Sequence, residues 1–196
     1  MADVTFAQSA FPPLALGFFG LGTGYLIYGP HELLHFPPKD ESVNRSLGVW
    51  GIWMPGFCQF LTGMILFIGL TWLQVFQKSA PLYMAALAFT AYGVHWFAIG
   101  WNRYQGNDGR TGVGMSVAFM VISAMGATVF FAANDIAVGI LFIGLFLIYL
   151  SDFFASLRMR IGEIALGAFH LATGIWLMYL AFGVAVDFAL GYHWKV

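Results

Sequence analysis

The stretch IAVGILFIGLFLIYLSDFFA, from Ile136 to Ala155, decides the fold class of this chain. Asp152 is its only charged side chain, and the rest is almost entirely apolar. An α-helix needs about 20 such residues to cross the hydrocarbon core of a bilayer, which is about 30 Å thick. Strands of membrane β-barrels are about ten residues long and alternate polar with apolar side chains, so they do not fit. The stretch therefore predicts a membrane-spanning helix.

Five further apolar stretches lie along the chain, separated by polar or proline-rich breaks. The first begins at Phe11-Pro12-Pro13, and proline is well tolerated in the first turn of a helix. We therefore expect an all-α integral membrane protein, with residues 1–196 forming one domain of six transmembrane helices in a bundle. The expected spans are about 12–28, 47–73, 81–101, 112–133, 136–155 and 161–190.

The composition also indicates a membrane protein. Of the 196 residues, 60% are hydrophobic and 9% are charged, whereas a soluble domain has about 25% charged residues. The formal net charge is -1 and no basic block is present, so nothing suggests nucleic-acid binding. Cys58 is the only cysteine, which excludes a disulfide within the chain. No basic segment precedes the first apolar stretch, so we expect no cleavable signal peptide.

The basic residues are distributed unevenly between the two ends of the expected bundle. The end that holds both termini carries Lys78 and Lys195, and the other end carries Lys39, Arg45, Arg103, Arg110, Arg158 and Arg160. The positive-inside rule places the more basic end in the cytoplasm. No lysine or arginine falls within an expected span, so we expect a pathway for anions to contain no fixed cation.

The segment GPHELLHFPP, Gly29–Pro38, contains the zinc-protease signature H-E-x-x-H. That signature works when a helix places both histidines on one face, with the glutamate as general base. Here prolines flank it closely on both sides, and Pro37 disfavours a helical conformation in the residue before it. No third ligand is evident nearby. We interpret the segment as a polar cap where the first helix leaves the membrane, without a metal site or catalytic residues.

Glycine spacing predicts close helix packing. The first span places Gly17, Gly20 and Gly24 three and four residues apart, and small residues let helix backbones approach each other in lipid. The sequence ILFIGL occurs twice, at Ile65–Leu70 and Ile140–Leu145. The two copies lie in the second and fifth spans, and spans that are three positions apart in the chain run in opposite directions. This repeated sequence therefore suggests an inverted repeat of three plus three helices.

Three stretches inside the spans combine glycines with polar residues: GIWMPGFCQFLTG at 51–63, FTAYGVHW at 89–96, and GAFHLATGIWLMYLAFGVAVDFALG at 167–191. Together they resemble the acetate uptake transporter family, to which the bacterial succinate–acetate permease belongs. The run F-T-x-Y-G-x-x-W is the most specific match, and the number of spans agrees. The family signature N-P-A-P-L-G-L is replaced by AFPPLAL at Ala10–Leu16, so the chain resembles a divergent member.

The resemblance implies a channel or transporter for small monocarboxylates such as acetate, with succinate as a further substrate. It implies a homo-hexamer in the cell membrane, not an enzyme, without a cofactor and with one pathway through each subunit. An apolar constriction in that pathway would map onto Phe19, Tyr92 and Leu147. The family also places both termini in the cytoplasm, against the positive-inside rule, so both orientations stay open.

Polar side chains within the spans are further candidates for the pathway, because polar groups in hydrocarbon need a partner or a cavity. Thr90 and Tyr92 offer hydroxyl groups to a carboxylate, and a histidine can carry a proton near neutral pH. The alternative for each is a hydrogen bond between helices. Asp152 either extends toward Arg158 or acts as a proton-linked acid. The polar candidates are Gln59, Thr90, His95 and His170.

Two other functions stay open from the sequence. The lost asparagine of the family signature suits an accessory subunit of a membrane complex that does not transport. His95 and His170 lie within spans, as haem ligands of membrane cytochromes do. Whether transport is passive or proton-linked is also undecided.

Overall fold

The computed structural model of the protein describes residues 9–76 and 80–191. These residues form helices and short helical turns, with no strand among them. Six helical segments are long and apolar enough to cross a membrane, which confirms the predicted all-α fold with six spans. The segments are Phe11–Leu34 (α1), Glu41–Trp72 (α2 to η3), Ala80–Gln105 (α4), Gly109–Ala132 (η4 and α5), Ile136–Ser156 (α6) and Arg160–Leu190 (α7).

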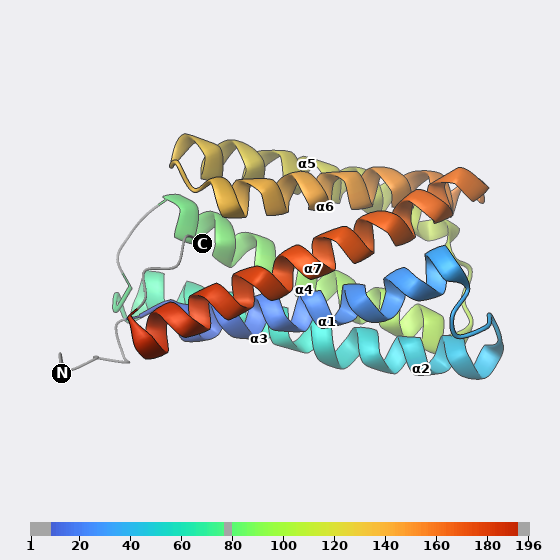
Figure 1. Cartoon of the computed structure of the whole chain (residues 1–196), viewed down its shortest axis with the longest axis horizontal. Helices are drawn as coiled ribbons and strands as arrows, with labels where there is room; N and C mark the ends of the chain where they lie inside the picture. Colours follow the sequence, from blue (N-terminus) through green and yellow to red (C-terminus); the bar gives the residue numbers. More distant parts are fainter. Residues whose placement is uncertain (1–8, 77–79, 192–196) are drawn as a thin grey trace.

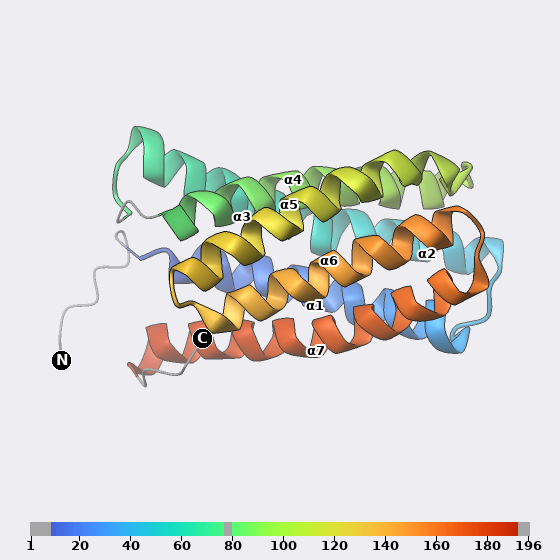
Figure 2. The same ribbon diagram turned by 90° about the horizontal axis from the view of Figure 1, so that it is seen from above.

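The six segments run along the long axis of the molecule (Figure 1), and their contacts close into a ring. Going round it, α1 contacts α7, followed by α6, α5 and α4, and the composite second segment closes the ring between α4 and α1. Figure 2 shows the same arrangement from above. Ring neighbours are antiparallel, so α1, α4 and α6 begin at one end, which we call the N-terminal end. The opposite end, which we call the basic end, carries Lys39, Arg110 and Arg158 in its loops.

The second segment is not a regular α-helix throughout, because it contains two π-helical turns. It consists of α2 (Glu41–Gly51), the π-helical turn η2 (Ile52–Phe57), α3 (Cys58–Phe67) and a second π-helical turn η3 (Ile68–Trp72). η2 contains Pro55, which has no N–H for a regular helical hydrogen bond, and π-helical turns accommodate such interruptions. The segment begins earlier than the predicted residue 47, because Asp40 accepts a hydrogen bond of 2.9 Å from the Val43 amide and caps α2.

α1 is longer than predicted and extends six residues beyond Tyr28, to Leu34. It ends where His35 takes a left-handed conformation, with φ of 53°, and the His35 amide bonds to the Pro30 carbonyl. The extension makes His31 and Glu32 part of the helix, and both are buried. These two residues of the segment interpreted as a polar cap are therefore part of α1 and lie inside the bundle.

Glycine allows the close helix packing that its spacing predicted. A Cβ atom on Gly20 would lie 2.6 Å from the Met54 carbonyl oxygen, and one on Gly48 would lie 2.5 Å from the Gly100 carbonyl oxygen. These distances leave no room for a side chain, so α1 meets η2, and α2 meets α4, backbone to backbone.

The two ILFIGL stretches differ in local structure. Ile65–Leu70 crosses the junction of α3 with η3, whereas Ile140–Leu145 lies within the regular helix α6. The inverted repeat that this repeated sequence suggested stays a prediction.

Candidate functional site

Two cavities lie between the helices, toward opposite ends of the bundle. The smaller, of about 430 Å³, is lined by residues near the starts of α1, α4 and α6 and the ends of α5 and α7. The larger cavity, of about 1250 Å³, is lined by residues near the opposite ends of the same five helices and by the loop between α4 and α5. The smaller cavity therefore faces the N-terminal end, and the larger faces the basic end.

The cavities approach each other at a similar depth in three helices. In α1, Leu21 lines the smaller cavity and Tyr25, one turn later, lines the larger. In α6 the same change occurs between Leu145 and Tyr149. Tyr92 of α4 lines the smaller cavity, and its ring stacks on that of Tyr149 with centroids 5.7 Å apart. Buried aromatic and apolar side chains thus form the boundary between the cavities.

The smaller cavity is mainly apolar. Its ionisable side chains are Asp135 and Asp187, and no lysine, arginine or histidine is among its described lining residues. Asp135 caps α6 by accepting a hydrogen bond of 3.1 Å from the Val138 amide, and burial raises the pKa of its carboxyl. An ionised carboxylate would find no opposite charge among the described residues of this cavity wall.

Gln59 of α3 is the most unusual polar residue of the smaller cavity. Its side chain is fully buried, and among the described residues neither its amide nitrogen nor its amide oxygen has a hydrogen-bond partner. An unpaired buried polar group costs about 1–3 kcal/mol. Gln59 is among the residues that line the cavity, and its amide group, with N–H donors and a carbonyl oxygen, is not committed to another described residue.

Tyr92 is held by a hydrogen bond between helices, which was the alternative to a pathway role. Its hydroxyl lies 2.9 Å from Ser123 Oγ of α5, and Ser123 Oγ donates to the Phe119 carbonyl at 2.7 Å. Since the serine proton is committed to Phe119, Tyr92 is the donor to Ser123. The Tyr92 oxygen therefore keeps acceptor capacity and has no further proton to donate.

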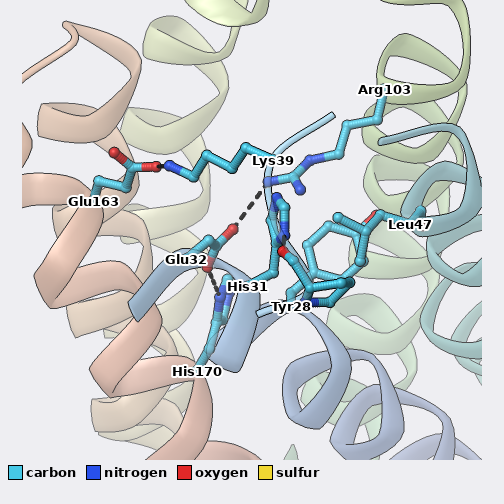
Figure 3. A network of polar contacts seen from close by, with 9 residues as sticks. Tyr28, His31, Glu32, Lys39, Leu47, Arg103, Glu163 and His170 are labelled. Atoms are coloured by element: carbon cyan, nitrogen blue, oxygen red, sulfur yellow. Dashed lines mark hydrogen bonds and ion pairs between the residues drawn. The ribbon is translucent and has the colours of Figure 1, made fainter. Parts of the chain in front are cut away.

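The larger cavity has an ion network in its wall, shown in Figure 3. The buried carboxylate of Glu32 accepts a hydrogen bond from Arg103 Nη2 at 3.0 Å through one oxygen. Its other oxygen lies 2.6 Å from His170 Nδ1. These three residues come from α1, α4 and α7, so the network joins three helices. Arg103 lies within α4, which runs to Gln105, and this corrects the expectation that no cation falls within a span.

Neighbouring contacts fix the network in place (Figure 3). The Arg103 guanidinium carbon lies 4.5 Å from the centroid of the Tyr28 ring, and Tyr28 donates to the Leu47 carbonyl at 2.8 Å. Lys39 and Glu163 form a further ion pair beside it. The sequence could not reveal this network, because its partners are far apart in the chain. The only signal was an acidic residue next to the first apolar stretch.

The remaining polar candidates lie at the larger cavity but separately from one another. Thr90 donates to the Ala86 carbonyl of its own helix at 2.8 Å. His95 has Nδ1 at 3.5 Å from the Tyr149 hydroxyl, and its Nε2 has no partner among the described residues. His170 is paired with Glu32 and stacks on Tyr25, with centroids 4.6 Å apart. Both histidine rings thus pack against aromatic side chains, His95 against Phe119 with centroids 4.6 Å apart and His170 against Tyr25.

Asp152 does not extend to Arg158, since no ion pair joins the two among the described residues. Its carboxyl group instead accepts a hydrogen bond from Ser116 Oγ of α5 at 2.6 Å. Asp152 lines the larger cavity, so its wall contains this carboxyl group as well as that of Glu32. Its role as a proton-linked acid stays a prediction.

The structure does not bring Phe19 and Leu147 together with Tyr92. Phe19 is 50% exposed on the outer surface of the chain and, like Leu147, lines neither of the two cavities. The inward position in α1 belongs to Phe18, which is 5% exposed and lines the smaller cavity. The physical reason is helix geometry, because successive residues point about 100° apart and a shift of one residue moves a ring from the inner to the outer face.

The H-E-x-x-H segment does not have the geometry of a zinc-protease site. His31 is helical and buried, with Nδ1 3.0 Å from the Pro37 carbonyl oxygen, whereas His35 has left the helix and is exposed. The two imidazoles therefore do not share a helix face. Both oxygens of Glu32 are engaged by Arg103 and His170. Among residues 9–76 and 80–191, no group of three or more potential ligands is placed to hold a metal ion.

Comparison with known proteins supports the fold. No protein-family model matches the chain, and no curated protein matches it in sequence. The structure is similar to a solved structure described as the bacterial acetate channel SatP, with a TM-score of 0.70 and 17% sequence identity. The match covers 91% of this chain and 94% of that one. The chain is therefore a multi-pass membrane protein with the fold of this acetate channel, as its resemblance to the acetate uptake transporter family implied.

Proposed function

We propose that the protein is a channel or transporter for small monocarboxylates such as acetate, located in the cell membrane. The observation that carries this proposal is the pair of cavities that reach from opposite ends of one bundle to a shared aromatic boundary. The similarity in fold to an acetate channel supports the same substrate class. A homo-hexamer, which the sequence resemblance implies, is part of the proposal and is testable by native mass spectrometry.

The acid crosses the smaller cavity in its neutral form. The described wall offers no lysine, arginine or histidine to a carboxylate. Gln59 offers one donor and one acceptor, which match the carbonyl and the O–H of a protonated carboxylic acid. Tyr92 offers an acceptor only, which again suits an O–H donor. Transport is therefore proton-linked, with one proton accompanying each acid molecule.

His95 is placed to exchange that proton. It lies in the wall of the larger cavity, next to the aromatic boundary, and its Nε2 has no partner among the described residues. An imidazole can accept a proton on one side and donate one on the other. We expect His95→Gln to slow uptake of acetate more at neutral than at acidic pH, where the acid is already protonated.

Uptake by purified protein in liposomes tests the proposed function. Labelled formate, acetate, butyrate and succinate should be compared at pH 5.5 and 7.5, with empty liposomes subtracted. We expect acetate uptake that is saturable and faster at the lower pH. An accessory subunit predicts no uptake above that of empty liposomes at either pH.

Gln59→Leu tests the contact with neutral acid. Because neither amide atom has a hydrogen-bond partner among the described residues, the apolar replacement should keep or raise thermal stability. We expect acetate uptake to fall by about tenfold, the loss of one or two hydrogen bonds. Thr62→Val is the matched control on the same helix, since Thr62 donates to the Pro13 carbonyl at 2.7 Å rather than lining a cavity. Equal uptake by Gln59→Leu and wild type would exclude this contact.

A further inference from the structure

The guanidinium of Arg103 already holds a carboxylate, that of Glu32, in the wall of the larger cavity. Glu32 is almost completely buried, with 5% of its side chain exposed, whereas Arg103 is 28% exposed. The arginine therefore contacts the buried glutamate on one side and the cavity on the other. This is the only guanidinium that forms an ion pair with a buried carboxylate among the described residues.

Arg103 has hydrogen-bonding capacity left for a second carboxylate. A guanidinium carries five N–H donors in a planar fork, and among the described residues Arg103 uses one of them, toward Glu32. The Arg103 guanidinium carbon lies 4.5 Å from the centroid of the Tyr28 ring. A planar fork with unused donors suits bidentate binding of a carboxylate.

Glu32 can remain paired if Arg103 turns toward a ligand. Its second oxygen keeps the 2.6 Å contact with His170, so loss of the arginine would not leave it without a partner. The side chain of Glu32 ends in a carboxylate, which is the same chemical group that a monocarboxylate ligand carries. It therefore competes with that ligand for the same guanidinium.

Building on the proposed function, we propose that Arg103 binds the carboxylate of the transported acid at the basic end, and that Glu32 is an internal carboxylate competing for the same guanidinium. The ligand class is the ionised form of a small monocarboxylic acid. The acid is thus recognised as an anion in the larger cavity and crosses the smaller one as a neutral molecule.

Acetate binding to the purified protein in detergent tests this proposal, measured by line broadening of ¹³C-acetate in NMR. Removal of Arg103 alone would leave the buried Glu32 carboxylate with only its His170 contact among the described residues, and this risks misfolding. The comparison therefore uses Glu32→Gln and the double variant Glu32→Gln/Arg103→Gln. The double variant replaces the ion pair by neutral groups of similar size, whereas Glu32→Gln neutralises the carboxylate and keeps the positive charge of Arg103. Arg45→Gln controls for lost positive charge, because Arg45 is exposed, pairs with Glu41 and lines neither cavity.

We expect Glu32→Gln to bind acetate more tightly than wild type, because the internal competitor is gone. Adding Arg103→Gln should weaken binding by at least about tenfold relative to Glu32→Gln, as for loss of a charge-assisted hydrogen bond. Acetamide, a neutral analogue, should not compete in any variant. Equal dissociation constants for the single and double variants, or weaker binding by folded Glu32→Gln than by wild type, would overturn the proposal.

Liposome uptake separates this proposal from the proposed function. If the wild type takes up acetate but the single and double variants bind acetate equally well, the Arg103 site is refuted and the transport function is supported. If acetate binding depends on Arg103 but the wild type shows no uptake, the transport function is refuted and the protein has an acetate-binding site.

Discussion

The rings of Tyr92 and Tyr149 stack nearly parallel, 5.7 Å apart and 8° from coplanar orientation, at the boundary between the two cavities. One ring belongs to α4 and the other to α6, and each is 2% exposed. Phe119 of α5 packs against both, with centroids 5.2 Å and 5.1 Å away. Three helices therefore contribute one aromatic ring each to the same boundary.

Truncation of this boundary should change size selectivity. If the proposed pathway runs past this boundary, Tyr92→Ala should raise uptake of butyrate relative to acetate, because removal of the ring leaves more space between the two cavities. Phe19→Ala is the control, since that ring faces outward and lines neither cavity. Uptake of formate, acetate, butyrate and succinate should be measured at equal amounts of folded protein. An unchanged butyrate-to-acetate ratio in Tyr92→Ala, or a raised ratio in Phe19→Ala, would refute this placement of the constriction.

Close packing of α2 on α4 should make Gly100 intolerant of a side chain. A Cβ atom there would lie 2.6 Å from the Gly48 carbonyl oxygen, so Gly100→Ala should cost about 1–3 kcal/mol through overpacking. Gly114→Ala is the matched change in α5, where a Cβ meets nothing within 4 Å, and should be neutral or stabilising. Thermal unfolding in detergent measures both. Equal melting temperatures for the two variants would contradict the packing described for α2 and α4.

Asp40 should give α2 a pH-dependent stability. Hydrogen bonds from the Val43 amide and the Ser42 hydroxyl lower the pKa of the Asp40 carboxyl below its usual value. A carboxyl with a lower pKa in the folded than in the unfolded state stabilises the fold above its unfolded pKa, and this stabilisation is lost as pH falls through the folded pKa. Asparagine also caps helices but does not titrate.

The measurement for Asp40 is the difference in melting temperature between wild type and Asp40→Asn at pH 6 and at pH 3. We expect the advantage of wild type to shrink at pH 3, while the other carboxyl groups titrate equally in both proteins. A difference that stays constant between the two pH values would show that Asp40 does not have the lowered pKa.

The H-E-x-x-H segment should bind no zinc. Its second histidine lies outside the helix, and its glutamate is paired with Arg103 and His170. We expect metal analysis of dialysed protein to find far less than one zinc per chain, unchanged in His31→Ala. One zinc per wild-type chain that disappears in His31→Ala would reverse this interpretation.

The sequence by itself determined the number, approximate position and class of the spans. Long apolar runs such as Ile136–Ala155 are stable in a bilayer only as helices, because each helix satisfies its own backbone hydrogen bonds. Local features also followed from composition and spacing. The glycines of the first span predicted close helix contact, and Gly20 against Met54 provides it.

Only the tertiary structure decided which side chains meet. Phe18 rather than Phe19 faces the smaller cavity, because the rotation of α1 is set by its packing against neighbouring helices. Glu32 and His170 are 138 residues apart in the chain yet lie 2.6 Å apart in space. The extension of α1 past Pro30 buried Glu32, and the ring of helices then brought Arg103 and His170 to it, since a buried carboxylate must be paired. Sequence spacing carries no information about partners on other helices, so this network became visible only when the bundle was assembled.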